Sequence, residues 1–198
     1  MRKVQDYYFN RAKKEKYPAR SVFKLEEVQK KYHLFRSGDG VLDLGCHPGS
    51  WSLFASSVVG PDGLVVGVDL QETNKAPRDG GSPIYWIRGD ITDPELVGQV
   101  KKIRPAFKAV ISDIAPRTTG NKWADHQQSM RLVRQTLELA AIFLHEKGHY
   151  LCKIFQGEEM PEFVDELKAR FNFVKVIKPH SSRKESREVF VLGMEFRK

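Results

Sequence analysis

The chain has 198 residues, of which 40% are hydrophobic and 29% are charged, and its formal net charge at pH 7 is +8. This composition predicts one globular domain, residues 1–198, with a hydrophobic core. It excludes a membrane-spanning protein, because no apolar run approaches the roughly 20 residues that cross a bilayer. Two cysteines are too few for a disulfide scaffold. We expect a cytoplasmic, monomeric enzyme or binding protein.

Basic residues are concentrated at the N-terminus, which predicts a basic arm over residues 1–17. Residues 1–20 contain seven Lys or Arg, with Tyr7, Tyr8, Phe9 and Tyr17 among them. Cations neutralise phosphates, and aromatic rings stack on unpaired bases. The arm therefore favours a nucleic acid partner. The same aromatic side chains could instead pack on the domain, and the two interpretations are compatible.

Hydrophobic periodicity predicts alternating helices and strands along the chain. The predicted helices span about 19–32, 50–59, 94–103, 125–144 and 161–171, and the predicted strands span 41–44, 64–68, 83–87, 107–111, 149–155, 173–177 and 188–196. This order predicts a doubly wound α/β fold. The basic loop 178–187 is too short for a crossover helix, so the last strand is predicted to be antiparallel.

The sequence from Val41 to Trp51, VLDLGCHPGSW, predicts a strand, a tight turn with two glycines, and the start of a helix. In an open α/β sheet, nucleotide-containing ligands bind at such a turn. The Gly-x-x-x-Gly spacing differs from the Gly-x-Gly-x-x-Gly of dinucleotide-binding folds, which disfavours a dehydrogenase. Any strand-to-helix turn can have this pattern, so the turn alone leaves the ligand open.

Acidic residues follow the next three predicted strands: Asp69, Asp90 and Asp113. An acidic residue after the second strand is placed to accept hydrogen bonds from ribose hydroxyls. A carboxylate at a strand end often only caps a loop. Three of them beside a glycine turn fit an adenosine-containing cofactor.

Lys153 follows the apolar run Tyr150-Leu-Cys152 near the end of a predicted strand, and lysine is seldom buried without a partner. If the antiparallel last strand lies beside the fifth strand, Glu188 at its start lies next to Lys153. A purely structural ion pair is an equally good interpretation. Lys24 lies at the edge of the apolar stripe of the first predicted helix, where a lysine by default extends its ammonium group to solvent.

Five motifs, in order along nearly the whole chain, resemble those of the FtsJ/RrmJ ribose 2′-O-methyltransferases. They are Ser21–Leu25 (SVFKL), Asp43–Trp51 (DLGCHPGSW), Ser112–Pro116 (SDIAP), Lys153–Gly157 (KIFQG) and Lys178–Val189 (KPHSSRKESREV). The family pattern has small residues where this chain has Cys46-His47, and glycine where it has Ser50. These departures could alter cofactor affinity.

The resemblance implies a Rossmann-like methyltransferase fold: a seven-stranded, mostly parallel sheet with an antiparallel last strand and helices on both faces. It implies a catalytic tetrad and a site for S-adenosylmethionine, and no metal. The tetrad would be Lys24, Asp113, Lys153 and Glu188, with Glu185 as a competitor for the glutamate position. The cofactor residues would be Gly45, Gly49, Trp51, Asp69, Asp90 and Asp113.

The implied activity is S-adenosylmethionine-dependent 2′-O-methylation of a ribose in RNA, with RNA or a ribosomal subunit as partner. The expected substrate is a uridine of large-subunit (23S) ribosomal RNA, and the alternative is a tRNA anticodon-loop nucleotide. In the expected mechanism Lys153 takes the hydroxyl proton or steers the oxygen, and Lys24, as a second cation nearby, favours the uncharged form of Lys153. Asp113 and Glu188 orient the two lysines.

Three other classes remain as rivals. A methyltransferase acting on a small molecule or a protein leaves the basic arm unexplained. A cytosine-C5 methyltransferase needs a cysteine nucleophile, and neither Cys46 nor Cys152 follows a proline as expected for such enzymes. A non-catalytic RNA-binding module would not bind the cofactor.

Overall fold

The protein is described by a computed structural model that covers residues 2–116, 119–183 and 185–198. The side chains of residues 2–6 and of Lys122 lie outside this description, so the predicted contributions of Arg2, Lys3 and Lys184 to the basic arm and loop do too. The helices are α1 (Arg2–Lys14), α2 (Val22–Tyr32), α3 (Ser50–Val59), α4 (Glu95–Ile103), α5 (Lys122–Phe143) and α6 (Met160–Arg170). The strands are β1 (Gly40–Leu44), β2 (Leu64–Asp69), β3 (Ile84–Arg88), β4 (Phe107–Ser112), β5 (Leu144–Phe155), β6 (Phe171–Ile177) and β7 (Glu188–Phe196).

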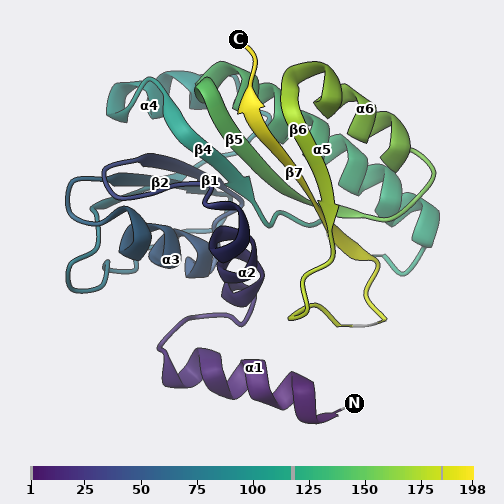
Figure 1. Ribbon diagram of the computed structural model, residues 1–198, viewed down its shortest axis with the longest axis horizontal. Helices are drawn as coiled ribbons and strands as arrows, with labels where there is room; N and C mark the ends of the chain where they lie inside the picture. Colours follow the sequence, from purple (N-terminus) through teal and green to yellow (C-terminus); the bar gives the residue numbers. More distant parts are fainter. Residues whose placement is uncertain (1, 117–118, 184) are drawn as a thin grey trace.

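The seven strands form one twisted sheet in the order β3-β2-β1-β4-β5-β7-β6 (Figure 1). The strands from β3 to β5 run parallel, and β7 is antiparallel to both of its neighbours, β5 and β6. The predicted mostly parallel sheet with an antiparallel last strand is confirmed. Its carboxyl edge, where parallel strands end, is where ligands bind in such folds.

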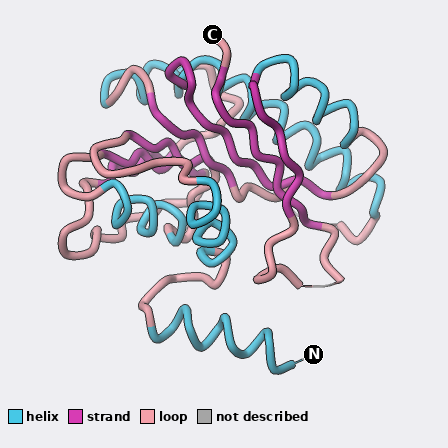
Figure 2. Tube along the Cα trace, in the orientation of Figure 1, coloured by secondary structure: helices cyan, strands magenta, loops and turns pink. Residues whose placement is uncertain are grey.

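Helices cover both faces of the sheet (Figure 2), which also confirms the prediction. On one face α2 and α3 pack through Leu25, Val28 and Ala55 against strand residues such as Val41. On the other face α4, α5 and α6 pack against alternate strand residues such as Leu42. Strands buried on both faces need continuous apolar runs, which explains why their sequences do not alternate with polar residues. None of the described helices is both long and apolar enough to cross a bilayer.

The predicted basic arm is mostly the helix α1, which lies beside α2 at one end of the molecule (Figure 1). Ala12 is buried, Tyr8 lies 5.4 Å from Phe23 between ring centroids, and Arg11 forms a 2.8 Å ion pair with Glu26. In contrast, Tyr7 and Phe9 are 60% and 63% exposed. Some aromatic side chains of the arm therefore fix it to the domain and others face solvent.

The predicted boundary between the 125–144 helix and the following strand is wrong. α5 begins at Lys122, because the Asn121 side chain accepts hydrogen bonds from the backbone N–H groups of Trp123 and Ala124. It ends at Phe143, and β5 begins at Leu144, which pairs with Phe107 in β4. Leu144 continues the helical spacing of apolar residues and is also buried as a strand residue, so periodicity alone could not assign it.

Candidate active site

The glycine turn joins β1 to α3 at the carboxyl edge of the sheet. Gly45 and Gly49 have φ values of +76° and +100°, which residues with side chains rarely adopt. A Cβ atom on Gly45 would lie 2.8 Å from the Cβ atom of Ile114, so the turn also needs glycine for space. The N-terminus of α3 has no side-chain cap, which leaves its first N–H groups and partial positive charge available to an anionic group.

The residues that depart from the family pattern have contacts of their own. Ser50 accepts a 2.7 Å hydrogen bond from the backbone N–H of Ala19, which fixes the segment before α2. The backbone N–H of His47 donates to Asp69 at 2.9 Å, and the His47 ring lies 3.3 Å from the Thr73 hydroxyl. Cys46 is buried, and burial raises the pKa of its thiol. These substitutions preserve the turn.

The acidic residues after β2 and β3 are partly engaged within the chain. Asp69 accepts hydrogen bonds from the backbone N–H groups of His47 and Gln71. Asp90 is exposed, and one of its oxygens accepts from both the backbone and the hydroxyl of Thr92 at 2.8 Å. Each carboxylate has further acceptor capacity. The roles of these two residues in cofactor binding stay predictions.

Asp43 in β1 is a buried acidic residue, two positions before Gly45, that the sequence did not predict to be important. Its side chain is fully buried; the Ser52 hydroxyl donates to one oxygen at 2.6 Å, and the other has no hydrogen-bond partner among the described residues. Burial raises the pKa of Asp43 to about 7. The available signal was an aspartate inside an otherwise apolar strand.

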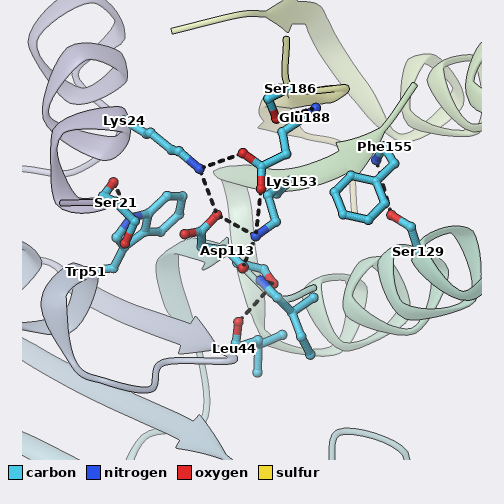
Figure 3. A network of polar contacts seen from close by, with 12 residues as sticks. Ser21, Lys24, Leu44, Trp51, Asp113, Ser129, Lys153, Phe155, Ser186 and Glu188 are labelled. Carbon is cyan, nitrogen blue, oxygen red and sulfur yellow. Dashed lines mark hydrogen bonds and ion pairs between the residues drawn. The ribbon is translucent and has the colours of Figure 1, made fainter. Parts of the chain in front are cut away.

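Four charged side chains meet beside the glycine turn (Figure 3). They come from distant parts of the chain: Lys24 from α2, Asp113 from the end of β4, Lys153 from β5 and Glu188 from the start of β7. β5 and β7 pair so that Phe155 lies opposite Glu188. The register explains why the start of β7 lies next to Lys153, as the antiparallel prediction required.

The four groups alternate in charge. Lys153 Nζ lies 3.0 Å from Asp113 Oδ1 and 3.8 Å from Glu188 Oε1, and it donates a 2.6 Å hydrogen bond to the backbone oxygen of Asp113. Lys24 Nζ lies 3.0 Å from Glu188 Oε2 and 3.9 Å from Asp113 Oδ1. Glu188, and not Glu185, is therefore the glutamate that pairs with both ammonium groups.

The tetrad is largely shielded from solvent. The Lys153 and Lys24 side chains are only 7% and 11% exposed, so Lys24 does not extend to solvent as its position on the helix suggested. Burial alone would raise the pKa of Glu188, but the charges of Lys24 and Lys153 outweigh it and lower that pKa below its ordinary value. Two ammonium groups and two carboxylates hold the site near neutrality.

Trp51 joins the glycine turn to the tetrad (Figure 3). Its indole N–H donates to the backbone oxygen of Ser21 at 3.0 Å, and its ring lies 5.8 Å from that of Phe190. The side chain is buried. These contacts hold α2, and with it Lys24, next to the start of α3. A role for Trp51 in cofactor binding stays a prediction.

A pocket of about 490 Å³ opens beside the tetrad. It is lined by Arg20, Ser21, Lys24, Arg183, Glu185, Ser186 and Glu188. Burial and the nearby charge of Arg183 lower the pKa of Arg20. Two guanidinium groups that share one pocket wall suit an anionic ligand such as a phosphate. Across the part of the chain that the structure describes, no group of three or more His, Cys, Asp or Glu residues is arranged to hold a metal.

Comparison with known proteins gives consistent results. The sequence profile of the FtsJ-like methyltransferases matches residues 17–196. The chain is 57% identical to a protein of Desulfotalea psychrophila named ribosomal RNA large subunit methyltransferase E, over 100% of this chain and 98% of that protein. A protein of the same name from Syntrophobacter fumaroxidans is 45% identical, with 98% of each chain covered. The crystal structure of a candidate ribosomal RNA methyltransferase from Plasmodium falciparum has a TM-score of 0.78 and 25% identity, over 91% of this chain and 98% of that chain.

Proposed function

The chain belongs to the FtsJ-like methyltransferase family, and from this premise we propose that it transfers a methyl group from S-adenosylmethionine to a ribose 2′-hydroxyl of large-subunit ribosomal RNA, at a uridine. The observation that carries the proposal is the buried, charge-alternating tetrad of Lys24, Asp113, Lys153 and Glu188 beside the glycine turn. The names of the relatives favour ribosomal RNA over the tRNA alternative.

The residues around the turn fit the cofactor. The uncapped N-terminus of α3 suits the carboxylate of its methionine part. Asp69 and Asp90 offer acceptors for ribose hydroxyls, and Gly45 and Gly49 let the backbone approach closely. Asp113 belongs both to the predicted cofactor residues and to the tetrad. Its backbone follows β4 at the carboxyl edge of the sheet, and its carboxylate pairs with Lys153. When bound, the cofactor supplies an electrophilic methyl group on a sulfonium sulfur.

The tetrad supplies the acid–base and orienting part of the reaction. A hydroxyl is a weak nucleophile, so its proton must leave as the oxygen attacks. Lys153 accepts this proton if it reacts as an uncharged amine, or steers the oxygen if it reacts as an ammonium group, and Lys24 lies beside the same carboxylates as a second cation. Asp113 and Glu188 fix the directions of both ammonium groups. Holding the 2′-oxygen in line with the methyl group contributes further acceleration.

Two basic surfaces, one beside the tetrad and one beside α1, are suited to an RNA backbone. The pocket beside the tetrad carries Arg20 and Arg183. A larger hollow of about 750 Å³ lies between the end of α1 and the loop after β2, and its cationic lining residues are Lys13, Lys14, Lys16, Lys75 and Arg78. A phosphate bound in the pocket beside the tetrad would bring a strand to the tetrad, and the hollow beside α1 could bind further phosphates. Arg78 also stacks on Tyr17, but a small-molecule substrate would not account for the four lysines of this hollow.

The test is transfer of tritiated methyl groups from S-adenosylmethionine to RNA from cells that lack this protein. Large ribosomal subunits and total tRNA are offered separately, and methylated riboses are located as positions that resist alkaline hydrolysis. We expect label at one uridine of large-subunit RNA. Label confined to tRNA would replace the substrate, and no label in either RNA, with the cofactor bound, would overturn the proposal.

A further inference from the structure

Trp123, near the start of α5, has the most exposed side chain of the large hydrophobic residues that the structure describes, at 68%. The start of this helix is capped. The Asn121 side chain accepts hydrogen bonds from the backbone N–H groups of Trp123, at 3.0 Å, and of Ala124, at 3.2 Å. An Asn cap of this kind stabilises the first turn. The helix therefore presents a large aromatic ring to solvent from a fixed backbone.

The ring lines a pocket of about 390 Å³, together with His126, Gln127, Gly157, Glu158 and Arg187. The His126 side chain is buried, and both of its ring nitrogens are engaged: Nδ1 lies 3.1 Å from the backbone oxygen of Phe155, and Nε2 accepts from the backbone N–H of Glu159 at 3.4 Å. A Cβ atom on Gly157 would lie 2.4 Å from the His126 ring. One wall of the pocket is thus rigid.

This pocket lies next to the tetrad but outside it. Arg187 directly precedes Glu188, and its guanidinium group donates to the backbone oxygen of Gln156. The backbone N–H of Gln156 in turn donates to the backbone oxygen of Arg187 at 2.9 Å. Phe155 pairs with Glu188 in the sheet. The ends of β5 and β7 therefore hold the pocket and the tetrad in fixed relative positions.

The lining combines one exposed indole, the guanidinium group of Arg187, the carboxylate of Glu158 and other polar groups that can donate or accept hydrogen bonds. An apolar side chain of a partner protein would contact only one apolar surface in this pocket, the Trp123 ring. A nucleobase would find a ring to stack on, a cation close to its phosphate and polar groups for its edges. Resting on the proposed function, we propose that this pocket binds the base of an RNA nucleotide that neighbours the methylated one, with Trp123 stacked on that base.

The test compares two strands of equal charge: decauridylate and an abasic ribose-phosphate strand of the same length, each labelled with fluorescein. Binding is measured by fluorescence anisotropy for the wild type, for Trp123→Ala and for Trp123→Phe. Tyr85→Ala is the matched control, because Tyr85 is an exposed aromatic residue of β3, at the far edge of the sheet. Circular dichroism spectra establish that each variant is folded.

We expect the wild type to bind decauridylate about 5- to 150-fold more tightly than the abasic strand, the range of one base–aromatic stack. Trp123→Ala should lose most of this preference, and Trp123→Phe and Tyr85→Ala should keep it. An unchanged preference in Trp123→Ala overturns the inference and leaves the proposed function intact, even if that variant is slower on whole ribosomal subunits. No binding of either strand by the wild type counts against the proposed RNA substrate itself.

Discussion

Replacement of Lys153 by alanine tests the proposed chemistry most directly. Lys153 Nζ lies 3.0 Å from Asp113 Oδ1 and donates to the Asp113 backbone oxygen at 2.6 Å. Without it, Lys24 at 3.9 Å is the nearest cation to that carboxylate oxygen among the pairs in the tetrad. The group that takes or steers the proton is lost, which costs roughly 10²- to 10⁴-fold in rate, or about 3–5 kcal/mol in activation free energy.

The assay is single-turnover methyl transfer with saturating RNA, with cofactor affinity measured separately by calorimetry. We expect Lys153→Ala to bind the cofactor as the wild type does, because Lys153 is not among the predicted cofactor residues. Lys175→Ala is the charge-matched control, since Lys175 is exposed on the edge strand β6. A Lys153→Ala rate within about tenfold of the wild type, with cofactor bound, would refute the proposed role.

Lys153→Arg separates the two forms of this role. Arginine keeps the positive charge but does not release a proton in proteins. If Lys153 accepts the proton, Lys153→Arg should be nearly as slow as Lys153→Ala. If Lys153 only steers the oxygen by charge and hydrogen bonding, Lys153→Arg should recover a substantial part of the rate.

Three further results are expected. Gly45→Ala should weaken cofactor binding, and it should lower the urea midpoint of unfolding more than Gly38→Ala does. Both glycines have positive φ, but only Gly45 has a neighbour within 4 Å of an added Cβ atom. Equal effects of the two substitutions would contradict the steric argument. Burial raises the pKa of Asp43 from 3.8 to about 7. Between these pH values the native chain keeps a proton that the unfolded chain releases. The free energy of unfolding should therefore fall by up to about 4 kcal/mol as the pH rises from about 4 to about 7. Urea unfolding at several pH values should show this slope in the wild type and not in Asp43→Asn. RNA affinity should fall steeply with salt, and Lys13→Ala in the hollow beside α1 should reduce the log–log slope by about 0.7; a flat salt dependence would point to an uncharged substrate.

The pairing of Lys153 with Glu188 could be predicted from the sequence because it needs local information and one assumption about strand order. A buried strand has a lysine near its end, the ten-residue loop before the last strand cannot hold a crossover helix, and the last strand begins with glutamate. The one assumption was that the last strand lies beside the fifth, and the structure has β7 there. Both the apolar run before Lys153 and the length of the loop can be read from consecutive residues in the sequence.

The position of Lys24 could not be derived in this way. Helical periodicity identifies the buried face of α2 but not the strand end that the helix crosses. That crossing is fixed by contacts between distant segments: Trp51 with the backbone of Ser21, and Ser50 with that of Ala19. Only the resemblance to a family indicated Lys24. The buried carboxylate of Asp43 was missed for a similar reason, since a sequence does not show which strand residues face a helix start.

The direction of β7 explains why Glu188 of the tetrad and Arg183 of the adjacent pocket lie at the same edge of the sheet. The parallel strands have only their carboxyl ends at this edge. Each can therefore place a residue there only where the strand ends, as Asp113 and Lys153 show. β7 runs the other way between β5 and β6, and it brings its first residue, Glu188, to the same place. The loop that enters β7 carries Arg183 there as well. A parallel β7 would instead put its last residue, Phe196, at this edge, and the carboxylate that pairs with both lysines would be absent. The tetrad therefore requires the antiparallel direction of β7.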